Sequence, residues 1–391
     1  MDKIYLDNAA TTPLSPEVID AMVDTMKMNF GNPSSTHSFG QEAKILIENV
    51  RRQVADYLHV SPAEIIFTSC GTESNNMIIK SSVEHLGVER IISSPMEHKC
   101  VSESILEMKN RKGVEVAYIR PNEKGDIDLD KLKELLKASD KKTLVSLMHA
   151  NNEIGNMIDI KKVAHLCKEN NALFHSDTVQ TMAHMNLDFS EIPLDFASCS
   201  AHKFHGPKGI GFAFLRKSSG LKGIITGGPQ ERSLRAGTEN VCGIAGLGKA
   251  LELSIKNMEV YTQQIQEIKQ YAIDRISEEI PGVKFNGRSS ENENSLYTVI
   301  SVLLPYKNPL IGLQLDMKGI AVSQGSACSS GASKPSMVMM MVLSEDEMDH
   351  CTPLRVSFSH LTTKTEIDQF VQALKEISHN LIIENTNVEH R

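Results

Sequence analysis

Residues 199–211, CSAHKFHGPKGIG, bring together groups that could support three kinds of chemistry. Cys199, His202 and His205 have a spacing that suits a catalytic zinc ion with an open coordination position. The glycines of the stretch would suit a phosphate-binding turn. Lys203 could form a Schiff base, because a lysine desolvated near other cations has a lowered pKa. Its positive charge among the three possible zinc ligands disfavours a metal site.

Three further polar groups follow apolar, strand-like runs, as Lys203 does. Asp177 ends the run ALFHSD, His98 follows ERIISS, and Thr72 lies in the turn between AEIIFTS and a predicted helix. Taken alone, Asp177 and Thr72 would be interpreted as helix caps. Together the four groups match the needs of pyridoxal 5′-phosphate (PLP): a Schiff-base lysine, a carboxylate for the ring nitrogen, a phosphate site and a group over the ring. We therefore expect a PLP-dependent enzyme.

A possible nucleophile lies much later in the chain. Cys328 stands in a loop of small residues, SQGSACSSGASKP (323–335), which we expect to be exposed and mobile. A free thiol is only slightly ionised at neutral pH, so a nucleophilic Cys328 needs a base or a cation nearby; the alternative is an inert surface cysteine. The remaining cysteines outside these two stretches are expected to be structural: Cys70, Cys100, Cys167, Cys242 and Cys351.

Three other stretches allow more than one interpretation. Arg355, in the strand-like run PLRVSFS, could clamp a substrate carboxylate, or it could form a surface salt bridge. GIAGLGKA (243–250) imitates a P-loop, but Ala250 stands where a serine or threonine should bind magnesium, and the periodicity predicts a continuous helix. The methionines of SMVMMMVL (336–343) are expected to form a buried helix face rather than a partner surface.

The elements that must position these residues alternate between strands and helices. We expect an α/β fold, because strand-like runs at 63–69, 89–94, 114–119, 142–150, 172–177, 194–200 and 209–215 are separated by helical segments. This pattern predicts a mostly parallel sheet, and ligands bind such sheets at the carboxyl ends of the strands. A long helix over 240–280 would then lead into a smaller α+β domain whose last helix covers about 363–384.

We expect a large domain over residues 14–258 and a small domain formed by 1–13 and 259–391. The net charge of −8 disfavours a nucleic-acid partner, and no apolar run is long enough to cross a membrane. The N-terminus has no secretory or transit character, and the seven cysteines contain no CxxC pair. These features predict a cytoplasmic protein with neither a nucleic-acid nor a membrane partner.

Ten motifs occur in order across residues 5–359: YLDNAATTP, FGNPSSTH, TSCGTES, MEHKCV, NNEIG, FHSDTVQ, SAHKFHGPKGIG, RAGTEN, GSACSS and LRVSFS. Together they resemble the PLP-dependent cysteine desulfurases of the NifS/IscS type, in the class V aminotransferase group. The resemblance implies a PLP-dependent transferase of fold type I and a homodimer. It also implies a reaction that converts L-cysteine to L-alanine and leaves a persulfide on the enzyme.

The resemblance also implies a role for each matching residue. Lys203 would hold PLP and move protons, with His98 stacked on the ring and shuttling protons. Cys328 would attack the substrate sulfur, and its thiolate would be a transient ligand of an iron–sulfur cluster; no other metal ligand is expected. The other implied cofactor contacts are Asp177 at the ring nitrogen, Gln180 and Asn152 at the ring oxygen, Gly71, Thr72, Ser200 and His202 at the phosphate, and the partner subunit's Thr238. Asn152 and Arg355 would bind the substrate carboxylate.

The match has two departures. Ser359 and His360 replace a glycine and an arginine of the motif SLGRFTT, and the chain ends without the C-terminal extension that docks the iron–sulfur scaffold protein in IscS-like members. We expect a sulfur acceptor or an iron–sulfur scaffold protein as partner, for cluster assembly or other sulfur delivery. Two alternatives stay open: a selenocysteine lyase or other β-eliminating lyase, and a non-catalytic protein that binds a nucleotide or a metal.

Overall fold

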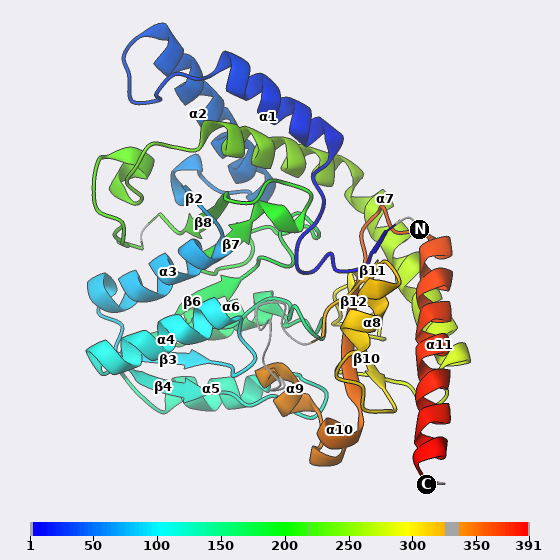
Figure 1. Ribbon diagram of the computed structural model, residues 1–391. Coiled ribbons are helices and arrows are strands. Elements are labelled where there is room, and N and C mark those ends of the chain that lie inside the picture. Colours follow the sequence, from blue (N-terminus) through cyan, green and yellow to red (C-terminus); the bar gives the residue numbers. More distant parts are fainter. Residues whose placement is uncertain (1–2, 218, 325–335, 390–391) are drawn as a thin grey trace.

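The computed structural model describes residues 3–217, 219–324 and 336–389. In this part of the chain, seven strands form the central sheet of the larger lobe in the order β2–β8–β7–β6–β5–β3–β4 (Figure 1). All neighbours pair in parallel except β8, which is antiparallel to both β2 and β7. The strands are β2 (Ile65–Thr68), β3 (Arg90–Ser93), β4 (Glu115–Tyr118), β5 (Thr143–Ser146), β6 (Leu173–Asp177), β7 (Phe196–Ser200) and β8 (Gly211–Leu215). All seven fall inside the strand-like runs that the sequence predicts.

Helices cover both faces of this sheet, because side chains alternate between two apolar clusters along each strand. In β3, for example, Ile91 packs with α3 and α4 on one face, whereas Ile92 packs with α2, α5 and α6 on the other. The helices of the larger lobe are α1 (Pro16–Met28), α2 (Ser38–Leu58), α3 (Gly71–Leu86), α4 (Lys99–Lys112), α5 (Leu129–Lys137) and α6 (Ile160–Glu169). Three short turns complete it: η1 (Pro62–Glu64), η2 (Ala201–Lys203) and η3 (Gln230–Ser233).

The smaller lobe has its own sheet and its own core. Its described strands pair as β12–β10–β9, antiparallel, and as β1–β11, parallel. These strands are β1 (Ile4–Tyr5), β9 (Lys284–Phe285), β10 (Val299–Leu304), β11 (Ile320–Ala321) and β12 (Thr352–Ser357). Its helices are α8 (Ile311–Met317), α9 (Met337–Val342), α10 (Glu345–His350) and α11 (Lys364–Glu389). The last helix runs five residues beyond the predicted end, because no glycine or proline interrupts the segment.

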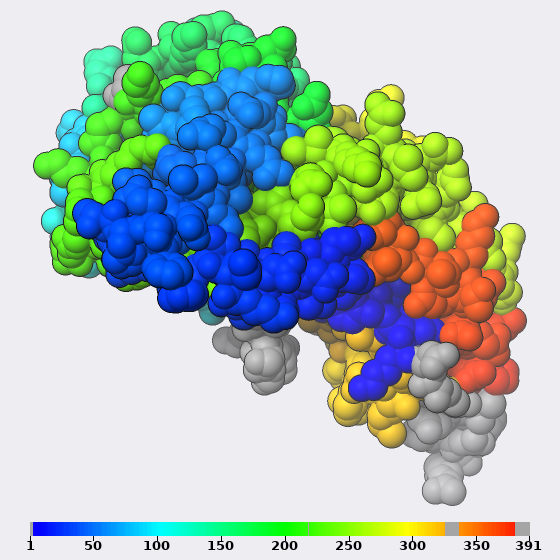
Figure 2. Space-filling view, turned by 90° about the horizontal axis from the view of Figure 1, so that it is seen from above, coloured from blue at the N-terminus to red at the C-terminus, as the bar shows by residue number. Residues whose placement is uncertain are grey.

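The long helix α7 (Val241–Glu279) connects the two lobes (Figure 1). Its first half contributes residues up to Leu251 to the core of the larger lobe, and its second half contributes residues from Ile265 onward to the other core. The domain division at 13/14 and 258/259 stays a prediction, which this change of core along α7 supports. Figure 2 shows the two unequal lobes from above.

The stretch GIAGLGKA lies inside α7, as its periodicity predicts, and is not a phosphate-binding loop. Its glycines instead allow close helix packing. A Cβ atom at Gly246 would come within 2.9 Å of Met22 on α1 and of Pro207, and one at Gly248 would meet Val50 on α2 at 2.8 Å.

The helix α9 forms the middle of SMVMMMVL; it buries Val338 and Met339, whereas Met337 and Met340 are about half exposed. The expected buried face is therefore present on one side of α9 only. Among the helices that the structure describes, none combines the length and the apolar character needed to span a bilayer.

We expect Lys269, a buried residue of α7, to make stability depend on pH. Its ammonium group donates hydrogen bonds to Ser295 Oγ (2.9 Å) and Leu296 O (3.1 Å), and burial lowers its pKa from 10.5 to about 8. Between these values the unfolded chain binds more protons than the folded chain, so the free energy of unfolding should rise with pH across this window. The Lys269→Met variant should lack this rise.

The measurement is denaturant unfolding of both proteins at several pH values across that window. A difference in unfolding free energy between wild type and Lys269→Met that stays constant with pH would contradict the prediction.

Candidate functional site

A pocket of about 730 Å³ opens at the carboxyl ends of the strands of the large sheet. The structure brings ten of the predicted site residues together around it: Gly71, Thr72, His98, Asn152, Asp177, Gln180, Ser200, His202, Lys203 and Arg355. They come from both lobes and are up to 284 positions apart in the chain, from 71 to 355. The meeting of those from the larger lobe follows from the parallel strand order, which places the ends of neighbouring strands at one edge, whereas Arg355 comes from β12 of the smaller lobe.

Lys203 ends the turn η2, directly after β7, and faces both this pocket and the N-terminal strap, which we define as residues 6–13. Its Nζ donates to the carbonyl oxygens of Ala9 (2.6 Å) and Ala10 (2.8 Å). The strap is itself attached to the turn, since Thr12 donates to the His202 carbonyl oxygen through both its N–H (2.9 Å) and its Oγ1 (3.0 Å). The lysine is therefore held in place by backbone from the start of the chain.

Asp177 ends β6 and is 6% exposed. Its Oδ2 accepts a hydrogen bond from Asn75 Nδ2 at 2.7 Å, and its Oδ1 accepts one from the N–H of Val179 at 3.0 Å. A buried carboxylate is costly unless hydrogen bonds and a positive partner compensate it. The side of Asp177 that faces the pocket is therefore suited to a cationic or protonated ligand.

The N-terminus of α3 and the end of β7 form a cradle for an anion. The first turn of α3 begins at Gly71 after Cys70, which provides no side-chain cap, so its N–H groups point toward the pocket. A Cβ atom at Gly71 would lie 2.5 Å from Val179 Cγ2, so only glycine fits there. Ser200 Oγ is buried and has no hydrogen-bond partner among the described residues. These features suit a bound phosphate group.

Two imidazoles of the pocket are electrically neutral near neutral pH. Burial, together with the positive charges of Lys203 and Lys208, lowers the pKa of His202 to about 4. Burial also lowers the pKa of His98, which caps α4 by accepting a hydrogen bond from the N–H of Cys100 at 3.2 Å. A neutral ring can stack on an aromatic ligand without desolvating a charge.

Arg355 reaches the pocket from β12 of the smaller lobe and is 3% exposed. Its Nη2 forms an ion pair with Asp7 Oδ1 at 2.8 Å, and its Nη1 donates to the carbonyl oxygen of Asn152 at 3.0 Å. Ser323 Oγ donates to the same Asp7 oxygen. The alternative of a surface salt bridge is therefore wrong: Arg355 does form an ion pair, but its guanidinium is buried at the pocket and Asp7 is only partly exposed.

The remaining two predicted site residues are Cys328 and Thr238. Cys328 lies outside the described residues. Thr238 is exposed on the segment between η3 and α7, away from the pocket of its own chain. Its assignment to a second subunit stays a prediction.

Several pocket residues were not predicted from the sequence: Asn75, Glu97, Cys100 and Glu153. Burial raises the pKa of Glu97 well above its usual value, and the N–H of Met148 donates to its Oε1 at 2.7 Å. Glu97 directly precedes His98, and Asn75 lies one helical turn after Gly71, so their positions beside predicted residues were the available signal. Cys100, which the sequence assigns to structure, lies 3.0 Å from His98 Nδ1.

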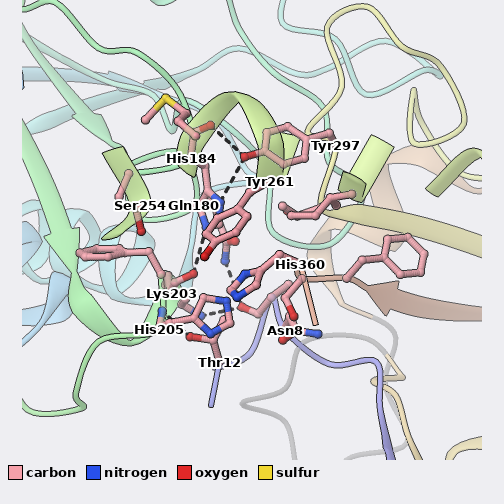
Figure 3. Close-up of a pocket in the computed structure, with 18 residues that line it drawn as sticks. Asn8, Thr12, Gln180, His184, Lys203, His205, Ser254, Tyr261, Tyr297 and His360 are labelled. Carbon is pink, nitrogen blue, oxygen red and sulfur yellow. Dashed lines mark hydrogen bonds between the residues drawn. The ribbon is translucent and has the colours of Figure 1, made fainter. Parts of the chain in front are cut away.

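A second cavity of only about 30 Å³ lies on the other side of Lys203 (Figure 3). His360 stacks on Tyr261 there, with ring centroids 3.9 Å apart, and stands edge-on to His205. Ser359 also lines this cavity and not the large pocket. The departures of Ser359 and His360 from the family motif therefore affect the packing behind Lys203.

This arrangement does not support the zinc interpretation of residues 199–205. His205 lines the small cavity, whereas His202 lines the large pocket. In the described part of the chain, no three His, Cys, Asp or Glu side chains are grouped so that they could hold a metal ion.

Comparisons with known proteins identify the family of this chain. Residues 4–370 match the family model described as aminotransferase class-V. The chain is 40% identical to the cysteine desulfurase IscS of Dictyoglomus turgidum over 97% of this chain and 95% of that protein. A solved NifS-like protein aligns with a TM-score of 0.87 at 33% identity, covering 96% of this chain and 99% of that one. A structure of SspA in complex with cysteine aligns with a TM-score of 0.78 at 30% identity, covering 92% and 100%.

The fold agrees with these matches, because the NifS-like structures share the mixed, mostly parallel sheet of fold type I. Both the family model and the relatives cover nearly the whole chain. The chain belongs to the class-V aminotransferase family and, within it, to the group of the IscS- and NifS-like proteins.

Proposed function

We propose that this protein is a PLP-dependent cysteine desulfurase, which releases L-alanine from L-cysteine and carries the sulfur as a persulfide on Cys328. The observation that carries the proposal is the single pocket in which Lys203, Asp177 and Arg355 meet. The names of the relatives, cysteine desulfurase IscS and NifS-like protein, support the same activity. The neighbour solved in complex with cysteine supports L-cysteine as the substrate.

The residues around the pocket fit PLP, which is the cofactor of this family. The cradle at Gly71, Thr72 and Ser200 suits its phosphate, and the buried carboxylate of Asp177 suits its ring nitrogen. When bound, PLP supplies an electron sink for the negative charge that develops at the substrate Cα. Lys203 would hold its aldehyde carbon and Gln180, whose Nε2 donates to Ala9 O at 3.1 Å, would lie beside its ring oxygen.

Proton transfer falls to two groups of the chain. The amine of Lys203 would accept and return a proton at the substrate Cα. The neutral imidazole of His98 would lie against the ring and exchange protons with the substrate.

Binding of the amino acid depends on the smaller lobe. Arg355 already has its guanidinium oriented by Asp7 and by the Asn152 carbonyl oxygen, while its Nε has no hydrogen-bond partner among the described residues. A substrate carboxylate would receive hydrogen bonds from this guanidinium and from the Asn152 side chain. Because the Arg355 side chain is already ordered before the substrate binds, less conformational entropy is lost on binding.

The sulfur step needs one thiolate and no external oxidant. Cys328 would attack the substrate sulfur, so that an S–S bond forms while the Cβ–S bond breaks. The electron pair of the broken bond stays with the carbon skeleton, and Cβ takes up a proton. L-cysteine and one enzyme thiol thus become L-alanine and one enzyme persulfide.

The proposed homodimer would bury an apolar face at one end of the molecule. Ile19, Val23 and Met26 lie on one side of α1 and are between 39% and 56% exposed. Phe30 and Phe39 follow, 70% and 51% exposed, with ring centroids 5.2 Å apart. Figure 2 shows α1 and the start of α2, in blue, along an open face of the molecule. An apolar surface of this kind is typical of a protein–protein interface.

The sulfur acceptor, either an iron–sulfur scaffold protein or another carrier, and the cytoplasmic location also remain proposals. The naming of several relatives as IscS supports the first. The free state of all six described cysteines supports the second, because disulfides are rare in reducing compartments.

The first test of this function is the Cys328→Ser variant. Wild-type protein incubated with L-cysteine should release L-alanine, and its Cys328 peptide should gain the mass of one sulfur atom. Cys328→Ser should keep the visible absorption of bound PLP and lose alanine release by at least about a hundredfold, because a hydroxyl does not replace a thiolate as nucleophile. Alanine and the peptide mass are measured by mass spectrometry.

Cys351→Ser, which changes a half-buried thiol outside the pocket, serves as the matched control and should behave as wild type. Undiminished alanine release by Cys328→Ser would show that another group accepts the sulfur, and absence of bound PLP in wild type would overturn the function itself.

The Arg355→Lys variant tests the substrate site. Lysine keeps the positive charge but lacks the planar pair of donors, so the KM for L-cysteine should rise by about tenfold or more, with a smaller change in kcat. Steady-state alanine release at varied L-cysteine concentration measures both constants. An unchanged KM would remove Arg355 from substrate binding.

A further inference from the structure

Asn75 is a fully buried asparagine of α3. It connects Asp177 with His98, which it reaches through Cys100. Its Nδ2 donates to Asp177 Oδ2 at 2.7 Å and to Cys100 Sγ at 3.2 Å. Its Oδ1 lies 3.0 Å from His175 Nε2, and His175 is also fully buried. One amide therefore contacts a carboxylate, a thiol and an imidazole.

The carboxylate determines the direction of every hydrogen bond in this chain of groups. An ionised Asp177 only accepts, so Asn75 must turn its NH₂ group toward it and its oxygen toward His175. His175 must then carry its proton on Nε2. Burial lowers the pKa of His175 to about 4, so the ring is neutral and its Nδ1 accepts from Ser146 Oγ at 2.9 Å.

The second branch ends at His98. Burial raises the pKa of Cys100 to about 12, so its thiol keeps its proton and can donate it to His98 Nδ1 at 3.0 Å. The N–H of Cys100 also points to His98 Nδ1. With Nδ1 occupied as an acceptor, the single proton of the neutral His98 ring lies on Nε2.

We propose that Asn75, oriented by both the Asp177 carboxylate and His175, is a positioning residue that keeps Asp177 directed as an acceptor toward the pocket and His98 protonated on Nε2. The proposal rests on the proposed function for the identity of the cofactor. As a consequence, the buried Asn75 amide would control the proton on the ring nitrogen of PLP. It would do so by positioning its neighbour Asp177 and not by contacting the ring alone.

The alternative orientation of the amide shows what His175 prevents. With the amide flipped, Asn75 Oδ1 would face the Asp177 carboxylate, and two acceptors in contact repel. Without its Asn75 donor the Asp177 carboxylate is no longer held in position to stabilise a protonated ring nitrogen. Asp177 acts electrostatically on Glu97, His98, Cys100, His175 and Cys199, and Lys203 also acts on His98.

The test compares two cofactors on the apo-protein: PLP and its 1-deaza analogue, in which a carbon replaces the ring nitrogen. The Asn75→Leu variant removes the donor to Asp177 without leaving room for water. Its affinity for PLP should fall by about tenfold to a hundredfold, the effect of losing a hydrogen bond to a charged group. Its affinity for the analogue should stay within about threefold of wild type, because that ring has no nitrogen for Asp177 to pair with.

A matched pair of variants tests the orientation of the amide. His175→Gln places an NH₂ group where Nε2–H was and should keep PLP affinity within about threefold of wild type. His175→Leu lacks a donor and should weaken PLP binding about as Asn75→Leu does. With PLP labelled by ¹⁵N in the ring, the nitrogen signal should move toward the unprotonated value in both Leu variants and stay at the wild-type position in His175→Gln.

Equal losses for PLP and the analogue in His175→Leu would indicate a merely structural role and overturn the proposal. So would a ¹⁵N signal at the wild-type position in the two Leu variants. If Asn75→Leu does not fold, the His175 pair decides alone. Failure of the proposed function is a different result: wild-type apo-protein would then bind neither PLP nor the analogue.

Discussion

The burial of one carboxylate sets the conditions for the rest of the pocket. Asp177 ends a central strand where water hardly reaches it, and an ionised group there requires donors inside the protein. Asn75 and the N–H of Val179 supply them from the protein side. The remaining face of the carboxylate is directed at the pocket, where a positively charged ring nitrogen would complete its compensation.

The imidazoles of this region are themselves buried, and their burial keeps them neutral. Desolvation lowers the pKa of His98, His175 and His202, and a neutral ring carries only one proton. The position of that proton is then decided by hydrogen-bond partners instead of by pH. Ring orientation, tautomer and charge are therefore consequences of packing in this pocket, which suits a site that must move protons in a fixed direction.

Residues of both lobes line the pocket. The N-terminal strap carries backbone oxygens to Lys203, and Asp7 at its beginning pairs with Arg355 of β12. The helix α7 joins the two cores with one rigid element, and Gly246 brings its first half close to α1. The cofactor side and the substrate side of the site are thus fixed relative to each other by the start and the middle of the chain.

The alternation of strands and helices was readable in the sequence because the strands are short, mostly apolar runs, as in IIFT at β2 and RIIS at β3. Residues that follow such runs, among them Lys203 and Asp177, could be placed at one edge of the sheet for the same reason. The motifs that resemble a known family added Asn152 and Gln180, which no periodicity indicates. Their roles, like that of Cys328, remain proposals.

The sequence by itself determined the fold class, the chain order of the elements and the residue types at the strand ends. Only the tertiary structure decided which of them touch. Asn75 meets Asp177 across 102 positions, and Arg355 meets Asp7 across 348. Such contacts depend on strand order and on which side of a helix faces the sheet, and so does the burial that shifts the pKa values. Local patterns of residues carry no information about the strand order or about which side of a helix faces the sheet.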